Sequence, residues 1–434
     1  MNILFIHNRQ VRNLGDRAIL AAMISQMRRI FPGCRIAIST SESAMCRHYF
    51  PECEVFPGIF DAETKNLPTK AAAGARTALN ALPRFLRAYL LEIRIVLRFA
   101  YVSLLARLGS HRIPVLGEYR RADLLLSVGG DFFSGTYGCL GFVSREIGLA
   151  KALGKPVIIY AQSIGPFSGG DIKRARKYLN MVDLILARDQ ETAELLTRYG
   201  VRAPVEVTAD CAVILEPVIN QKVRETVRRY GLGSNSVGFA LLEERFTNLA
   251  AATYGAYVLG MTELIRHARR AGYSPILIVA GPADASQTEA MKRRLGDDTP
   301  VFNALDLEPS EVKAVFSHMR ALVSSRMHPI IIGTSAGTPA MGVGKLLKMN
   351  NYLRAAGLEE YYISMVDFDL ARAKALFDKL VGTEDAVSRL RERLPVLSAR
   401  SEDNVVRVKA FFQAYEESRR QDISAEVSSP KNDG

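Results

Sequence analysis

Residues Lys155–Pro166, KPVIIYAQSIGP, form a continuous apolar run of strand length that ends in small and polar residues. An uninterrupted apolar strand is buried on both faces, which is typical of a parallel sheet covered by helices. Similar runs occur along the first half of the chain, each separated from the next by enough residues for a helix: NILFIH (2–7), CRIAIS (34–39), DLLLSVGG (123–130) and VDLILARD (182–189). This alternation predicts an α/β fold in which crossover helices join the strands of a parallel sheet.

The same alternation restarts after Pro217. The strand patterns of the second half are SVGFALL (236–242), SPILIVAG (274–281), RALVSS (320–325) and PAMGV (339–343), with helical patterns over 256–271, 284–295 and 309–318. A chain of 434 residues is too long for one ordinary core. We therefore expect two Rossmann-like domains, 1–216 and 217–369. Charge-rich helices over 370–420, which are candidates for returning to the first domain, and a polar, disordered tail over 421–434 complete the expected organisation.

The composition is that of a globular protein, with 48% apolar and 24% charged residues. The five cysteines form no CxxC pair, which argues for a reducing compartment and against structural zinc or a disulfide framework. The first residues lack a basic segment followed by a long apolar one, so we expect no signal peptide and a cytoplasmic location. The net charge of +12 comes without tryptophan or a nucleic-acid-binding motif, so an anionic lipid or small molecule is a better candidate partner than nucleic acid.

An insertion over about 66–115 interrupts the alternation. Arginines recur among long apolar residues over 70–112, and these charges are too frequent for a helix that spans a membrane. Two interpretations remain. The segment is either a basic amphipathic helix on an anionic membrane, which would hold the protein at the inner face of the plasma membrane, or a helix packed on its own protein with its arginines reaching into solvent.

Ligands of parallel sheets collect outside the carboxyl ends of the strands, where helix N-termini attract anions. In NLGDRAIL (13–20), Gly15 allows close backbone approach, and Asp16 is either an ordinary helix N-cap or a ligand residue. In LSVGGDFFSGTYG (126–138), Gly130 and Asp131 follow a strand and form either a tight turn or a nest for a phosphate or sugar hydroxyl. Neither segment matches the Walker A or dinucleotide fingerprint, so we do not predict NAD or a P-loop nucleotide.

Two further strand ends carry arginine. Arg188 follows VDLILA, and it pairs either with an anionic ligand or with a neighbouring carboxylate such as Asp189. Arg326 and His328 follow RALVSS, and Pro329 suits the first turn of a helix. If strand geometry continues, the two side chains point the same way, and the helix N-terminus helps Arg326 to hold an anion. The alternative is a strand end with polar residues exposed to water.

Seven of these segments resemble, in order, the polysaccharide pyruvyl transferase family. They are NLGDRAI, VGGDFF, YAQSIGPF, LARDQET, TADCAV, SSRMHPIIIG and AGTPAMGVGKLLK. The resemblance covers about residues 1–360 without the insertion. It implies two Rossmann-like domains facing a cleft, similar to the glycosyltransferase-B architecture, with the acceptor on the first domain and the donor on the second.

The resemblance also implies a reaction and residue roles. The donor is phosphoenolpyruvate, the product is a pyruvate ketal on a saccharide or lipid-linked saccharide, and neither a metal nor an organic cofactor is needed. His328 would be the catalytic acid and Asp16 a candidate base. Phosphoenolpyruvate would be bound by Arg326, Arg188 and Lys348, and the acceptor by Asp131, Gly15 and Gly130.

The chain departs from the family pattern at one position. The family commonly has Tyr-x-x-Lys near its last motif, whereas this chain has Lys345 in the tyrosine place and Lys348 in the lysine place. Two alternative functions stay open from the sequence. One is a nucleotide-sugar-dependent glycosyltransferase of the same architecture, and the other is a non-catalytic protein that docks a polysaccharide assembly complex at the membrane.

Overall fold

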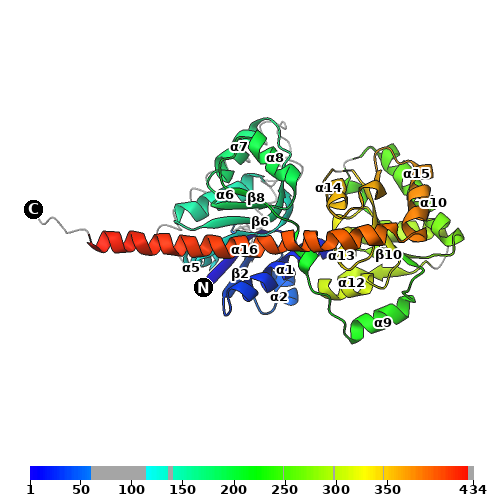
Figure 1. Cartoon of the computed structure of the whole chain (residues 1–434), viewed down its shortest axis with the longest axis horizontal. Helices are drawn as coiled ribbons and strands as arrows, with labels where there is room; N and C mark the ends of the chain where they lie inside the picture. The colour runs from blue at the N-terminus through cyan, green and yellow to red at the C-terminus, as the bar shows by residue number, and fades with distance from the viewer. Residues whose placement is uncertain (60–113, 135–139, 248, 297–298, 346, 429–434) are drawn as a thin grey trace, which may run out of the picture. The chain divides into compact units, whose positions relative to one another are not determined.

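The computed structural model describes residues 1–59, 114–134, 140–247, 249–296, 299–345 and 347–428 (Figure 1). In this part of the chain the strands form two sheets, and the neighbouring strands of both sheets run parallel. The chain divides into two compact units. The first comprises Met1–Gln10, Gln26–Val207 and Asn404–Gly434, and the second comprises Val11–Ser25 and Thr208–Asp403. The predicted α/β fold with two Rossmann-like domains and crossover helices is confirmed.

The sheet of the first unit has the strand order β3-β2-β1-β4-β6-β7-β8, with β5 paired to β6. Its strands are β1 (Asn2–Asn8), β2 (Arg35–Thr40), β3 (Glu54–Pro57), β4 (Leu124–Ser127), β5 (Gly130–Phe133), β6 (Val157–Ile164), β7 (Leu184–Ala187) and β8 (Val205–Val207). The strand order reverses between β1 and β4. In open parallel sheets this reversal leaves a crevice at the carboxyl ends, which is where ligands bind.

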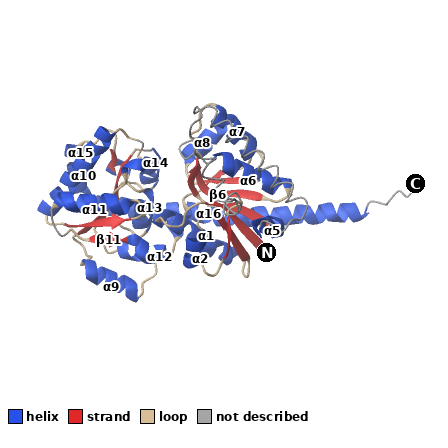
Figure 2. Ribbon diagram, turned by 180° about the vertical axis from the view of Figure 1, so that it is seen from behind, coloured by secondary structure: helices blue, strands red, loops and turns tan. Residues whose placement is uncertain are grey.

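Helices cover both faces of this sheet, because strands that are apolar on both faces must be shielded from water on each. The helices are α1 (Leu14–Ile30), α2 (Ser43–Tyr49), α5 (Pro114–Arg121), α6 (Leu140–Ala152), α7 (Gly170–Leu179) and α8 (Gln190–Arg198). Figure 2 shows α6, α7 and α8 gathered along one side of β6. There Ile147, Leu179 and Leu196 pack on Ile159 and Ile185 in one apolar cluster. A second cluster joins α5 to β1 and β4.

The sheet of the second unit has the strand order β11-β10-β9-β12-β13-β14. Its strands are β9 (Ser236–Ala240), β10 (Ser274–Val279), β11 (Val301–Asn303), β12 (Ala321–Ser324), β13 (Ala340–Gly344) and β14 (Tyr362–Ser364). Its helices are η2 (Cys211–Ile214), α9 (Gln221–Tyr230), η3 (Glu244–Phe246), α10 (Ala251–Arg270), α11 (Asp284–Leu295), η4 (Ala304–Asp306), α12 (Pro309–Phe316), α13 (Met327–Ser335), α14 (Leu347–Ala355), η5 (Glu359–Tyr361), α15 (Leu370–Gly382) and α16 (Asp385–Ser428). Here the strand order reverses between β9 and β12.

The beginning of α1 belongs to the second unit, although it follows the first strand of the other sheet. The backbone N–H of Leu14 donates to the carbonyl of Ala280 at 2.9 Å. The guanidinium of Arg17 is fully buried and donates to the carbonyls of Leu305 at 3.2 Å and Leu307 at 2.7 Å. Residues 11–25 were expected in the first domain, and the structure groups them with the second. The reason is that their hydrogen-bond partners lie more than 250 residues away in sequence, where no local pattern shows them.

The other predicted boundaries differ in smaller ways. The second unit begins at Thr208 rather than 217. Of the helices over 370–420 that were candidates for returning to the first domain, residues from Asn404 onward group with the first unit. The tail was predicted to be disordered over 421–434, and this is wrong for 421–428. These residues continue α16, because Gln, Ala and Glu favour a helix. The basic insertion was predicted over 66–115. Its residues up to 113 lie outside the described part of the chain, and its last two residues begin α5. Among the described helices, none has the length and apolarity needed to cross a membrane.

Candidate functional site

Arg326 and His328 lie where β12 gives way to α13, beside the reversal of strand order in the second unit. Strand geometry does not continue past Ser324. Arg326 is the extended N-cap of α13, and the helix begins at Met327. The Ser324 hydroxyl closes the turn by accepting from the N–H of Arg326 at 3.0 Å and donating to its carbonyl at 2.7 Å. The alternation expected from a strand is therefore absent, and the two side chains contact different neighbours.

Arg326 is held by a buried carboxylate. Its Nε donates to both oxygens of Asp284, at 3.0 and 2.9 Å, and its Nη2 donates to one of them. Asp284 begins α11 and is fully buried, and burial raises its pKa while the positive charge of Arg326 works against that rise. The guanidinium also lies 4.9 Å from the ring centre of Phe246. The pair fixes the plane of the guanidinium and leaves its Nη1 edge outside the contact with Asp284.

His328 lies between the first turn of α1 and the start of η2. A Cβ atom added at Gly15 would come within 2.0 Å of its Nδ1, so the ring packs directly on the glycine backbone. On the other side, Nε2 is 3.8 Å from Oδ2 of Asp210, which is buried. Gly15 was predicted to contact the acceptor from the first domain. The structure instead groups it with the second unit, as the residue whose missing side chain makes room for His328.

Asp16 is not the N-cap of α1. Asn13 takes that role, because its side-chain oxygen accepts from the N–H of Asp16 at 2.9 Å and its amide donates back to the Asp16 carboxylate. This reciprocal pair resembles a capping box. The charge of Asp16 also reaches Lys348 on α14. Burial lowers the pKa of Lys348 to about 8, and the Asp16 carboxylate opposes that change. Lys345, in the family's tyrosine place, donates to the carbonyl of Thr247.

Arg188 belongs to the first unit and is buried there. Its Nε donates to the Ser163 hydroxyl at 2.7 Å, and that hydroxyl donates to Oδ2 of Asp189 at 2.5 Å. The other oxygen of Asp189 caps α8 by accepting from the N–H of Thr192 at 2.8 Å. The structure thus connects Arg188 to Asp189, through Ser163, as one of the two sequence interpretations expected. All three residues of this network belong to the first unit, whereas Arg326 and His328 belong to the second.

Gly130 and Asp131 also lie in the first unit. They open the short strand β5, where Gly130 pairs with Gln162 of β6 and has a φ of 132°, a conformation that favours glycine. A histidine that sequence reasoning missed lies near the end of β1, with its ring centre 6.0 Å from that of Phe132 in β5. His7 is buried, and its Nδ1 lies 2.8 Å from the Ser127 hydroxyl. Burial lowers the pKa of His7 to about 3, so the ring is neutral at physiological pH.

Three residues of the second unit that contact Asp16, His328 and Arg326 were not singled out from the sequence, for a shared reason. Asn13, Asp210 and Asp284 each sit at a helix start, where polar residues are common as caps. The sequence offered one signal for Asp210, since it stands in TADCAV, and one for Asp284, since it follows the strand pattern SPILIVAG. In the described part of the chain, no group of three or more His, Cys, Asp or Glu side chains is arranged to hold a metal ion.

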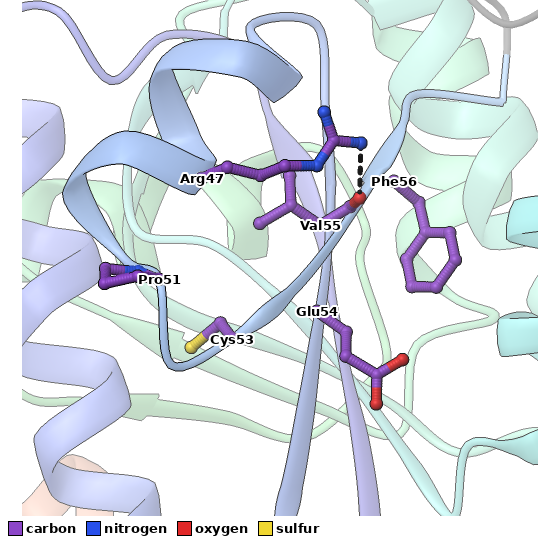
Figure 3. A pocket seen from close by; sticks show the side chains of 6 residues that line it. All are labelled: Arg47, Pro51, Cys53, Glu54, Val55 and Phe56. Carbon is purple, nitrogen blue, oxygen red and sulfur yellow. Dashed lines mark hydrogen bonds between the residues drawn. The ribbon is translucent and has the colours of Figure 1, made fainter.

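A hollow of about 400 Å³ lies away from these residues in the first unit (Figure 3). It is lined by Arg47, Pro51, Cys53, Glu54, Val55 and Phe56. The guanidinium of Arg47 donates to the carbonyl of Val55 at 2.9 Å. Burial raises the pKa of Cys53 to about 12, so its thiol stays protonated at neutral pH and is a poor nucleophile. The hollow lies at β3, the edge strand, and contains none of the residues predicted for catalysis.

The chain is similar to known proteins in sequence and in fold. It is 21% identical to the amylovoran biosynthesis protein AmsJ of Erwinia amylovora over 424 residues, covering 92% of this chain and 97% of that protein. Its fold matches Anabaena Alr3699/HepE, solved with UDP and glucose, with a TM-score of 0.54, 13% identity, and coverage of 97% of this chain and 100% of that chain. A putative UDP-N-acetylglucosamine 2-epimerase from Listeria monocytogenes matches with a TM-score of 0.58, 10% identity, and coverage of 95% and 97%.

The structural matches have low identity and bear on the fold alone, where they confirm the glycosyltransferase-B-like expectation. The family assignment comes from sequence. The model of polysaccharide pyruvyl transferases matches residues 13–344, a span that includes Asn13, Asp210, Arg326 and His328. That span is well over half of the chain, and the protein belongs to the polysaccharide pyruvyl transferase family.

Proposed function

We propose that the protein transfers the pyruvyl group of phosphoenolpyruvate to two hydroxyls of a saccharide, forming a ketal and releasing phosphate. The observation that carries the proposal is the arrangement around His328. An imidazole packed on Gly15 and facing a buried carboxylate lies near the start of α13, next to the N-cap Arg326. An acid beside a cation at a helix N-terminus suits a donor that is both anionic and in need of a proton.

The reaction balances with groups that this site offers. His328 gives a proton to the methylene carbon of phosphoenolpyruvate, and the first saccharide hydroxyl attacks the electron-poor C2. The C2–O bond to phosphate then breaks, and the second hydroxyl closes the ketal. Of the two protons that the hydroxyls lose, one returns to His328 and the other goes to the released phosphate. Asp16 is the candidate base for a hydroxyl, and the scheme needs neither a metal nor an organic cofactor.

Binding of the donor needs several cations because phosphoenolpyruvate carries about three negative charges near neutral pH, and guanidinium groups bind such oxyanions in pairs of hydrogen bonds. Arg326 would use its Nη1 edge, since Asp284 occupies the other side. Lys348 would add a second cation from α14. Arg188 stays a candidate donor ligand on the grounds of its sequence motif. Asp131 and Gly130 remain candidates for contacts with the acceptor.

The biological setting follows from the family and from the relative that is named for amylovoran biosynthesis. Both favour a role in exopolysaccharide or cell-wall polysaccharide biosynthesis, with a saccharide or lipid-linked saccharide as acceptor. Attachment to the inner face of an anionic membrane through the basic residues 70–112 belongs to the same proposal. Liposome flotation of the full chain, compared with a chain in which the arginines of 70–112 are replaced by glutamine, tests it, and equal flotation would contradict it.

The reaction is tested with purified protein, phosphoenolpyruvate and a panel of saccharides. We expect phosphate release together with a product heavier than the acceptor by one pyruvate ketal. His328→Ala should lower the rate by roughly 10²–10⁴-fold, the usual contribution of a proton donor. His318→Ala, an exposed histidine of the same unit, is the matched control. Turnover of a nucleotide sugar without turnover of phosphoenolpyruvate would support the glycosyltransferase alternative, and turnover of neither would support a docking protein.

A further inference from the structure

Asp210 is fixed in place on several sides. It is the N-cap of η2, and its Oδ1 accepts from the N–H of Ala212 at 3.0 Å. Its backbone carbonyl accepts from the hydroxyl of Ser401 on α16 at 2.9 Å and from the N–H of Val213 at 3.2 Å. Only 3% of the residue is exposed. Because Oδ1 serves the cap, Oδ2 is the oxygen that faces Nε2 of His328, at 3.8 Å.

The cap is made by Oδ1 and does not itself need a negative charge. Asparagine and serine cap helices as well as aspartate does, without the cost of removing a carboxylate from water. A buried carboxylate is tolerated when a cation or a set of donors compensates it. His328 supplies a group facing Oδ2 that becomes a cation when it takes up a proton. The distance of 3.8 Å makes this a charge–charge contact rather than a hydrogen bond.

We propose that Asp210 is a positioning residue for His328: its buried carboxylate holds the imidazole against Gly15 and stabilises the protonated ring. The inference rests on the proposed function, because it assigns Asp210 to the proton-donor site of that reaction. Asp210 acts on the reaction through His328, whose Nε2 it faces. It raises the fraction of His328 that carries a proton to give, and an aspartate beside a histidine acts in this way in other enzymes.

Other titratable and charged groups on α1, α13 and α14 are left unchanged when Asp210 is altered. Asp16 adjoins Gly15, and its charge acts on Lys348 of α14. Arg326 precedes the ring on its own helix. Tyr352 of α14 is bound to Thr334 of α13 at 2.7 Å, and its pKa is raised by burial, while the charge of Asp210 raises it further. The charge of Asp210 thus acts on a titrating group of α14 as well as lying 3.8 Å from the His328 ring of α13.

The substitution Asp210→Asn separates the two roles because asparagine keeps the cap and removes the charge. The ring of His328 is followed by NMR across pH, with its signal assigned by its loss in His328→Gln. We expect the midpoint of this titration in Asp210→Asn to fall by roughly one pH unit, as is usual when an opposite charge within 4–6 Å is removed. Above the midpoint the protonated fraction then falls about tenfold, and kcat/KM for phosphoenolpyruvate should fall by the same factor.

Asp369→Asn is the matched control. Asp369 caps α15 by accepting from the N–H of Arg372 at 3.0 Å, so the same change is made at a cap of the same unit. It should leave the His328 titration unchanged. Equal titration of His328 in the wild type and in Asp210→Asn would overturn the proposal and leave Asp210 as a cap only. The titration needs no substrate, so a wild type that releases no phosphate from phosphoenolpyruvate would overturn the proposed function separately.

Discussion

Gly15 makes room for the imidazole of His328 by having no side chain. Its φ does not lie in the left-handed region, so the backbone alone does not require glycine there. The requirement is space, since a Cβ would approach the His328 ring to 2.0 Å at Nδ1 and 2.4 Å at Cγ. The ring is confined on its other side by Asp210. An added methyl group therefore has to displace either the imidazole or the first turn of α1.

Gly15→Ala should lower the rate of phosphate release from phosphoenolpyruvate by about 10²-fold, because a displacement of roughly 1 Å at a catalytic group has that effect. Gly117→Ala is the control. Gly117 also lies in a helix, α5, and no atom lies within 4 Å of its added Cβ. Initial rates and the melting temperature of both variants are measured. A Gly15→Ala enzyme with wild-type rate would show that the position of His328 does not limit the reaction.

His7 makes the stability of the protein depend on pH. Its folded pKa of about 3 lies below the ordinary 6.5, because burial disfavours the charged ring. As pH falls below 6.5 the unfolded chain takes up a proton that the native state does not. The stability from this group is complete above that pH and is lost toward pH 3, by about 1.4 kcal/mol per unit within the window.

The test of this pH dependence compares melting temperatures at pH 7 and pH 5. The melting temperature of the wild type should fall more from pH 7 to pH 5 than that of His7→Gln, because glutamine at position 7 does not titrate. His48→Gln, at an exposed histidine, should behave as the wild type does. An equal loss in His7→Gln and in the wild type would mean that His7 is not the source of the acid sensitivity.

The sequence predicts residues better than it predicts their partners. Arg326 and His328 were singled out as candidates because they stand together after a strand pattern and match an ordered set of motifs. Asp284 was missed because it lies 42 residues before Arg326, and an aspartate at a helix start has a common alternative role as a cap. Gly15 was named as a candidate for the acceptor, which stays a prediction, and nothing local in the sequence shows that the imidazole of His328 packs on it.

Among the elements, α13 determines the position of His328 because it carries this residue in its first turn. Gly333 lies on the same helix where it crosses β12. A Cβ at Gly333 would lie 2.1 Å from Cδ1 of Leu322, which is 1% exposed and cannot retreat. Gly333→Ala should therefore destabilise the second unit by about 1–3 kcal/mol, the usual effect of overpacking, despite the better helix propensity of alanine.

The matched variant for Gly333→Ala is Gly255→Ala in α10, where nothing lies within 4 Å of the added Cβ. It has the same gain in helix propensity and should stabilise the protein by about 0.5–1 kcal/mol. Urea unfolding measures both. If both substitutions changed the free energy of unfolding in the same direction, close packing of α13 on β12 would not be the reason that position 333 requires glycine.

The strands were the elements best predicted from sequence. The apolar runs SVGFALL, SPILIVAG and RALVSS coincide with β9, β10 and β12, because both faces of these strands must be apolar. Helix limits were predicted less well. The start of α10 is at Ala251 rather than 256, and α16 extends to Ser428. Exposed helix ends carry few apolar residues, so the periodicity that indicates a helix fades before the helix stops.

At the scale of the whole molecule, the two units are not consecutive pieces of chain. Residues 11–25 leave the first unit for the second, and residues from Asn404 onward belong to the first. The sequence made the helices over 370–420 candidates for a return to the first domain, but it placed neither change of unit, since α1 and α16 are each continuous helices across it. Packing at the far end of α16 is the physical basis for its assignment. Val405, Val408 and Phe412 are buried there.

Phe412 gives the sharpest test of that assignment. It is 7% exposed, and its ring meets Phe31 of the first unit edge to face, with ring centres 5.5 Å apart. Truncation to alanine removes this contact and leaves a cavity, at a cost of about 3 kcal/mol. For a unit of this size the melting temperature should fall by roughly 6–12 °C. Calorimetry of the full chain measures the change.

Phe411→Ala is the control for Phe412→Ala because the two side chains are neighbours of identical chemistry. Phe411 is only partly buried and stacks on Tyr415 of its own helix, with ring centres 6.1 Å apart. Its loss should cost less than about 1 kcal/mol, as for other partly exposed positions. If both variants melt alike, the end of α16 does not stabilise the first unit. If only Phe412→Ala melts early, the first unit needs residues that follow the entire second unit in the chain, and it cannot be complete until the chain has been synthesised beyond them.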